Sequence, residues 1–166
     1  KGLLLEPMDL LPSMDNVLQR CKKAGVSKKN AMATRMDDYV GAVLNKLDEL
    51  RLREKTIVIF TSDHGSRGKN SVYEGGAKVP MMIEWPGMVE AASSCDSLIG
   101  NVDITATLIE LAGGIPASDV GEDSLSFARQ LTGKPEAKNW RDCMLIEAGN
   151  SKGVVSRDWK YILPIA

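Results

Sequence analysis

The sequence predicts an α/β protein: part of a doubly wound, mostly parallel sheet with flanking helices, followed by a small C-terminal antiparallel sheet. Three observations carry this prediction. A long amphipathic helical stretch leads into a short, continuously apolar run, which is the order of half a doubly wound unit. Polar and glycine-rich residues follow that run, where such sheets collect ligands. The last part of the chain holds three short apolar segments joined by tight turns with no helix between them.

The helical stretch begins near Ser27, a residue type that favours helix N-caps. Its apolar residues recur at spacings of four and three, which is the mark of one helix face. They are Met36, Val40, Val43, Leu47 and Leu50. Upstream, a shorter helix is possible before Gly25. The spacing therefore predicts a long helix that buries one face.

Residues 56–60, with the sequence TIVIF, are apolar at successive positions, so we expect a strand that is buried on both faces, central in a parallel sheet. The segment VPMMIEW predicts a second strand, closed by the turn WPG. Asp63 and His64 then lie just beyond the carboxyl end of the first strand. That position predicts a ligand site.

Asp103 is expected to cap a helix that ends at Gly113 and Gly114, and a second short helix is expected in SLSFARQLTG. Residues 141–163 then predict the antiparallel sheet. We therefore expect residues 1–140 to belong to an α/β domain and residues 141–166 to supply the strands of a small C-terminal subdomain.

Composition excludes several classes of partner. The chain has 166 residues with 21 basic and 22 acidic side chains, and a net charge of -1 argues against a nucleic-acid partner. No apolar run approaches the roughly 18 residues of a membrane span. The three cysteines show no CxxC spacing, which argues against a zinc ribbon. The chain opens on Lys1 and closes on an apolar run, so we expect the remainder of a longer polypeptide to be its first partner.

The residues around Asp63 suit a cation and an anion together. Asp63 offers a carboxylate oxygen and His64 an imidazole nitrogen, which together suit a divalent cation. Lys69 adds a compact positive charge within a loop that contains four glycines. The structural alternative is an Asx-turn, an ordinary glycine loop and a histidine with no ligand. From spacing alone, both interpretations stay open.

The longer sequence segments around these residues resemble the C-terminal part of the sulfatase family. The segments that carry the resemblance are TIVIFTSDHG, GKNSVYEGGAKVPMMIEWPG, NVDITATLIELAGG and SLSFARQLTGK, over about residues 35–163. Its most specific part is a strand that ends in S-D-[NH]-G, followed by Y-E-G-G-x-x-V-P and W-P-G. The resemblance implies an arylsulfatase-like hydrolase of the alkaline phosphatase superfamily that cleaves sulfate esters.

The resemblance also implies roles for single residues. Asp63 and His64 would bind a divalent cation, which is usually calcium in this family, with manganese or zinc as alternatives because histidine is a poorer calcium ligand than an amide oxygen. Lys69 would contact the sulfate group, while Lys78, Tyr73 and Glu74 would serve the structure of the loop. The substrate would be a sulfated small molecule or glycan, and the protein would be periplasmic, secreted or lysosomal.

One departure from the family pattern is decisive for this chain. Sulfatases make their nucleophile, a formylglycine, from the Cys or Ser of a C/S-x-P/A-x-R motif, and that motif is absent from this sequence. We therefore expect no catalytic residue within the chain and no activity from the chain alone. Two alternatives stay open: a metal-dependent phosphoester hydrolase or transferase of the same superfamily, and a truncated module without catalysis.

Overall fold

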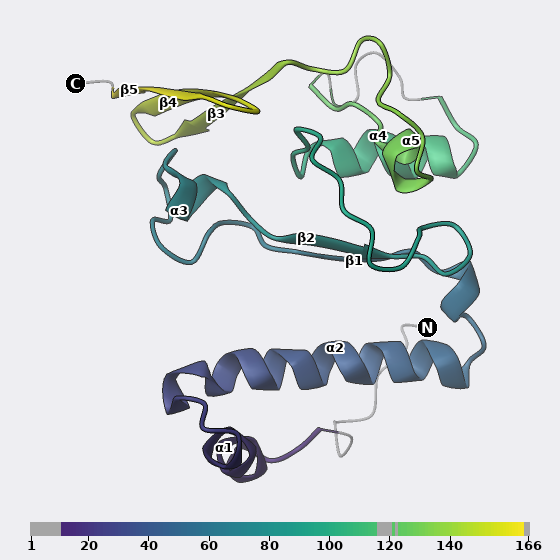
Figure 1. Cartoon of the computed structure of the whole chain (residues 1–166), viewed down its shortest axis with the longest axis vertical. Helices are drawn as coiled ribbons and strands as arrows, with labels where there is room; N and C mark the ends of the chain where they lie inside the picture. Colours follow the sequence, from purple (N-terminus) through teal and green to yellow (C-terminus); the bar gives the residue numbers. More distant parts are fainter. Residues whose placement is uncertain (1–10, 116–120, 122, 165–166) are drawn as a thin grey trace, which may run out of the picture. The chain divides into compact units, whose positions relative to one another are not determined.

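The computed structural model describes residues 11–115, 121 and 123–164. The chain divides into two compact units, with the boundary between Thr56 and Ile57. The first unit is helical and the second carries both sheets (Figure 1). This is a mixed α/β fragment, as the sequence predicts.

The first unit is a pair of helices joined by a short 3-10 turn. Helix α1 spans Met14–Lys23, the 3-10 turn η1 spans Lys28–Asn30, and helix α2 spans Ala31–Glu49. The Ser13 hydroxyl caps α1 by accepting a hydrogen bond from the Asn16 amide at 3.3 Å. Ser27 caps η1 rather than the long helix, so the predicted helix begins a few residues later than its N-cap signal suggested.

The first unit has a small core where the two helices meet. Val17, Cys21 and Ala31 are buried together there. Arg20 on α1 forms an ion pair with Asp38 on α2, and this hydrogen bond raises the pKa of the Arg20 guanidinium. Met36 and Val43 on the predicted apolar face of α2 are exposed.

The second unit begins with a two-stranded sheet. Strand β1 spans Val58–Thr61 and strand β2 spans Met81–Glu84. They pair antiparallel, with Ile59 opposite Ile83. Between them lie the loop and the one-turn helix α3, which spans Glu74–Ala77. The 3-10 turn η2 at Arg53–Lys55 closes the first unit, just before this sheet begins.

The structure corrects the prediction that the first strand lies in a parallel sheet. In the part of the chain that the structure describes, β1 has one paired neighbour and runs antiparallel to it. Its residues are half-buried rather than fully buried. A continuous apolar run indicates burial, but it carries no information on strand direction. The connection from β1 to β2 is a loop with one turn of helix, whereas parallel neighbours need a full crossover.

Among the described residues after β2 there are two helices. Helix α4 spans Asp103–Leu111 and helix α5 spans Ala128–Leu131, both near their expected positions. Gly113 lies just after α4 with φ 81°, the left-handed conformation that ends many helices. Phe127 is buried at the start of α5 and anchors it. Among the described residues, no helix is long and apolar enough to cross a membrane.

The C-terminal antiparallel sheet is confirmed. Strands β3, β4 and β5 span Cys143–Ala148, Ser151–Ser156 and Lys160–Pro164, in that order across the sheet (Figure 1). Leu145 lies opposite Val154, and Val154 opposite Tyr161, so one face carries a row of apolar side chains. Residues 165–166 of the expected subdomain lie outside the described residues.

Candidate metal and anion site

Asp63 and His64 lie just beyond the end of β1, with Ser62 between the last residue of the strand and Asp63, as predicted. The Asp63 side chain is 83% exposed, so its carboxylate is available to a ligand. One of its oxygens, Oδ1, accepts a hydrogen bond from the His64 backbone amide at 2.9 Å. This contact turns the carboxylate toward the histidine.

The His64 ring is held in one tautomer. Its Nδ1 lies 2.8 Å from the Gly65 carbonyl oxygen, which can only accept, so Nδ1 carries the proton. In the neutral ring the lone pair is then on Nε2, which lies 3.8 Å from Asp63 Oδ1. Two ligands of one cation lie about 3–4 Å apart. The pair therefore presents two donor atoms at a spacing that fits a divalent cation.

These two side chains cannot complete a coordination shell. Within the described ranges, no group of three or more His, Cys, Asp or Glu side chains is placed to hold a metal ion. Calcium takes about six to eight oxygen ligands and zinc about four ligands. The donor set fits part of a metal site, and the remaining ligands would have to come from elsewhere in the polypeptide.

The backbone just before Asp63 is held by a residue that the sequence analysis missed. Asn101 donates from Nδ2 to the Ser62 carbonyl at 2.9 Å and accepts from the Thr61 hydroxyl at 3.1 Å. The Ser62 hydroxyl donates to the His64 carbonyl at 2.7 Å. An asparagine before a helix carries no sequence signal for this role, because its partners lie about 40 residues away in the chain.

Lys69 and Lys78 differ in their contacts. Lys78 lies 3.9 Å from the Glu74 carboxylate, one helical turn back, which suits the structural role expected of it. Lys69 is exposed, and among the described residues its ammonium makes no hydrogen bond or ion pair. The structure thus brings Asp63 and His64 together, and Lys69 lies in the same loop without a contact to either.

The loop that carries Lys69 is closed at its base by backbone hydrogen bonds. The Gly65 amide donates to the Gly76 carbonyl at 2.7 Å, and the Arg67 amide donates to the Gly75 carbonyl at 3.0 Å. A Cβ added at Gly65 would collide with the Gly75 carbonyl, and one at Gly76 with the Gly68 carbonyl. The close approach of the backbone therefore requires glycine at both positions.

The Glu74 carboxylate makes a second contact that holds this loop in place. It pairs with Lys160 at the start of β5, and this hydrogen bond lowers the pKa of Glu74, with Lys78 adding to the effect. The Lys160 ammonium also donates to the Val72 carbonyl at 3.2 Å. Lys160 lies in the predicted antiparallel sheet, and no local pattern in the sequence indicates that it reaches this loop.

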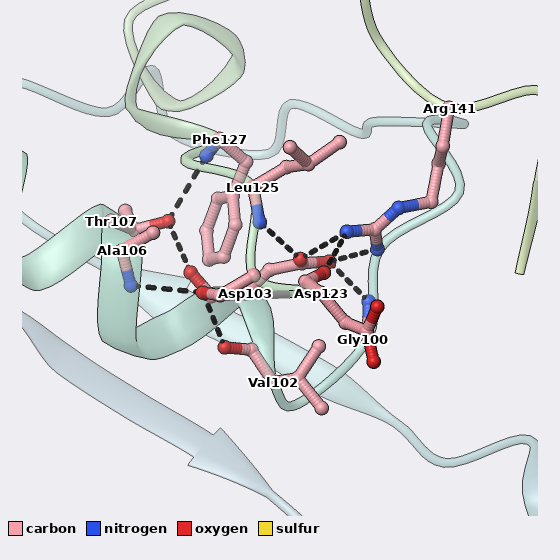
Figure 2. Close-up of polar contacts among 10 residues, drawn as sticks. Gly100, Val102, Asp103, Ala106, Thr107, Asp123, Leu125, Phe127 and Arg141 are labelled. Atoms are coloured by element: carbon pink, nitrogen blue, oxygen red, sulfur yellow. Dashed lines mark hydrogen bonds and ion pairs between the residues drawn. The ribbon is translucent and has the colours of Figure 1, made fainter. Parts of the chain in front are cut away.

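Asp103 is the centre of a buried network at the start of α4 (Figure 2). We expected it to cap α4, but it is the first residue of that helix and its carboxylate is fully buried. The carboxylate accepts two hydrogen bonds from Arg141, each 2.6 Å long. It also accepts from the amides of Gly100 and Leu125, each at 2.8 Å. The arrangement joins three segments of the second unit.

Curated relatives of the chain are sulfatases. It is 28% identical to an N-acetylgalactosamine-6-O-sulfatase of Bacteroides thetaiotaomicron over 86% of this chain and 32% of that protein. It is 35% identical to human steryl-sulfatase over 64% of this chain and 21% of that protein. The chain therefore spans a third or less of the length of these two relatives.

Solved structures share the fold. One, determined in complex with its substrate D-glucosamine-2-N,6-O-disulfate, matches with a TM-score of 0.73 at 24% identity, over 80% of this chain and 30% of that one. Another, described as a 2-O GAG sulfatase, matches with a TM-score of 0.66 at 22% identity, over 98% of this chain and 43% of that one.

The family model named Sulfatase matches residues 10–115. The match covers the helices of the first unit, the Asp63 and His64 turn, the Lys69 loop and helix α4. It extends further upstream than the segments on which the resemblance was first based. With more than half of its residues inside the match, the chain belongs to the sulfatase family.

Proposed function

We propose that this chain is the C-terminal portion of a sulfatase that hydrolyses sulfate esters. The observation that carries the proposal is the pairing of Asp63 Oδ1 with His64 Nε2 at 3.8 Å, with the other ring nitrogen tied to the Gly65 carbonyl. Ligating histidines commonly donate their second N–H to a backbone carbonyl, which fixes the ligating nitrogen. The family match, which includes Asp63 and His64, supports sulfate esters as the substrate class of the proposed enzyme.

Each residue of the site has a distinct task in this proposal. Asp63 and His64 would hold part of the coordination shell of a divalent cation, with the other ligands upstream. When bound, that cation would supply Lewis-acid polarisation of the sulfate oxygens. Lys69, which is exposed and uncommitted among the described residues, would bind the sulfate as a point charge.

The remaining parts of the enzyme lie outside this chain. The family resemblance implies a formylglycine nucleophile upstream, and this sequence has no C/S-x-P/A-x-R motif to supply it. We further propose that residues 1–140 complete an α/β domain and that residues 141–166 belong to a small C-terminal subdomain. The substrate would be a sulfated small molecule or glycan, as the names of the relatives suggest.

A phosphoester hydrolase is the second candidate, and one observation favours it. His64 offers an imidazole nitrogen where calcium prefers oxygen, and imidazole suits zinc or manganese better. The family match weighs toward sulfate. Metal analysis of the full-length parent, with assays on an aryl sulfate and the matching aryl phosphate, separates the two.

The test of the proposed residues uses the full-length parent with its formylglycine installed. Asp63→Asn should lower cation affinity, and Lys69→Ala should raise KM for the aryl sulfate by about ten- to a hundredfold, because one charge-assisted contact is lost. Lys78→Ala is the matched control and should leave KM nearly unchanged. If Lys78→Ala raised KM and Lys69→Ala did not, the two assignments would be reversed.

A further inference from the structure

Lys160 reaches from the C-terminal sheet to the loop that carries Lys69. It is the first residue of β5, and its side chain is only 15% exposed. Its ammonium donates to the Val72 carbonyl at 3.2 Å and forms an ion pair with the Glu74 carboxylate. All these residues belong to the second compact unit, so the contact joins two parts of one body.

Lys160 contacts the part of the loop that follows Lys69 in the sequence. The part of the loop before Lys69 is held by the backbone hydrogen bonds of the Gly65 and Arg67 amides. The chain reverses around Lys69, with Gly68 at φ 111° and Asn70 at φ 63°. Val72 is then buried, being 1% exposed, directly beneath the contact with Lys160.

The energetics explain why a lysine at this position acts on the loop. An ammonium that is mostly removed from water is costly unless it is paired. Its two partners in the described residues are Val72, at the end of the loop, and Glu74, the first residue of the helix α3 that follows the loop directly. If the loop moved away, Lys160 would lose both partners at once. The free energy of keeping Lys160 paired therefore favours one placement of the loop.

We propose that Lys160 is a positioning residue of the anion site, which holds the loop so that Lys69 is presented to the sulfate group. The proposal rests on the proposed function for the role of Lys69. Lys160 itself does not contact the anion, since its ammonium is committed to Val72 and Glu74. The C-terminal sheet would thereby set the affinity of the α/β domain for its substrate.

The first experiment tests the positioning without relying on activity. Trypsin cleaves after Arg67 and Lys69, and both bonds lie in this loop. In the full-length parent, Lys160→Met should raise the rate of cleavage at these bonds about tenfold, because proteolysis follows the population of the opened loop. Mass spectrometry of the fragments identifies the bonds that are cut.

Lys152→Met is the matched control. Lys152 lies in the same sheet and forms an ion pair 2.6 Å long with Glu147, with both side chains 53% exposed and neither in the loop. Its replacement should leave loop cleavage unchanged. Lys160→Arg should retain most of the protection, and Glu74→Gln should weaken it from the loop side even if Lys160→Met does not fold.

The second experiment measures anion binding through inhibition of aryl sulfate hydrolysis by inorganic sulfate. Lys160→Met should raise the inhibition constant about tenfold, with a larger effect on KM than on kcat. In the Lys69→Ala background, the same substitution should have little further effect, because the loop no longer presents a lysine. A purely structural role would give additive losses.

The two experiments separate failure of this inference from failure of the proposed function. Unchanged loop cleavage in Lys160→Met, or additive losses in the double variant, would overturn the positioning role. An inhibition constant that is unchanged by Lys69→Ala would overturn the proposed function on which the inference rests.

Discussion

Single residues decide the chemistry of the turn after β1. The Gly65 carbonyl accepts a hydrogen bond from His64 Nδ1, and the other ring nitrogen, Nε2, lies beside the Asp63 carboxylate. The position of that carboxylate depends in turn on the backbone at Ser62, which Asn101 holds. The orientation of a metal ligand depends on the hydrogen bonds that its side chain and the neighbouring backbone make.

Asn101→Ala should loosen this turn. The substitution removes the hydrogen bonds with Thr61 and Ser62, each contributing roughly 0.5–1.5 kcal/mol. In the full-length parent we expect a lower thermal midpoint and a cation affinity reduced by about ten- to a hundredfold, as for other groups that orient metal ligands. The exposed Asn139, replaced by Ala, serves as control; equal effects from both would show that Asn101 has no special role.

The Glu74 carboxylate should make stability depend on pH. Lys160 lowers the pKa of Glu74 below its ordinary value of 4.5, so the folded state favours the ionised form. The stabilisation is fully present above about pH 4.5 and is lost as pH falls through the lowered pKa. Because Glu74 is 61% exposed, solvent screens the pair and we expect at most about 1 kcal/mol.

Thermal midpoints of the full-length parent and its Glu74→Gln variant, measured between pH 3 and 7, test this dependence. The gap between the two proteins should be constant above about pH 5 and close at lower pH. A gap that widened toward pH 3 would contradict the ion pair.

At the scale of elements, helix α4 is joined to two later segments by one buried carboxylate. Arg141, which is 11% exposed, meets Asp103 with both terminal nitrogens, and it also donates to the Asp123 carbonyl at 2.8 Å (Figure 2). The Thr107 hydroxyl donates to the Asp103 carbonyl at 2.7 Å and accepts from the Phe127 amide at 3.0 Å. These contacts hold α4, α5 and the start of the C-terminal sheet together.

Asp103→Ala should be strongly destabilising. It leaves the Arg141 charge buried without its partner, and removal of one member of a buried pair costs about 3–5 kcal/mol. We expect a large fall in the thermal midpoint of the full-length parent, or failure to accumulate folded protein. Asp123→Ala is the control, because Arg141 contacts only the backbone carbonyl of that residue. A comparable loss in both variants would argue against the buried pair as the cause.

At the scale of the whole molecule, the chain covers only part of a sulfatase. It corresponds to 32% of the bacterial relative and 30% of the solved structure with the disulfated glucosamine. The described residues contain two donor atoms, on Asp63 and His64, at a spacing that fits a cation, and no group of three or more His, Cys, Asp or Glu side chains placed to hold one. In the proposed enzyme, the other ligands and the nucleophile would come from the remainder of the polypeptide.

The chain by itself should bind calcium only in roughly the millimolar range and should not hydrolyse an aryl sulfate. A cation and a lysine stabilise charge, but they do not supply the nucleophile. Calorimetric titration and a chromogenic assay, run on this chain and on its full-length parent, provide the measurement. Micromolar calcium binding or clear turnover by the 166-residue chain would contradict the proposal.

Local signals in the sequence were sufficient for several elements. The spacing of apolar residues predicted α2, because a helix face repeats every three or four residues whatever it packs against. Tight turns between short apolar segments predicted the sheet at β3–β5, because adjacent antiparallel strands need only short connections. The motif around Asp63 and the YEGG segment gave the family, which the match over residues 10–115 confirms.

Local patterns in the sequence were thus enough to predict the family, most helix and strand positions and a site at Asp63 and His64. The antiparallel pairing of β1, the support of the turn by Asn101 and the contact of Lys160 with Glu74 become visible only in the folded chain. The physical reason is distance along the chain. Periodicity and turn chemistry act within a few residues, whereas strand direction and the partners of a buried charge are set by segments that meet only after folding.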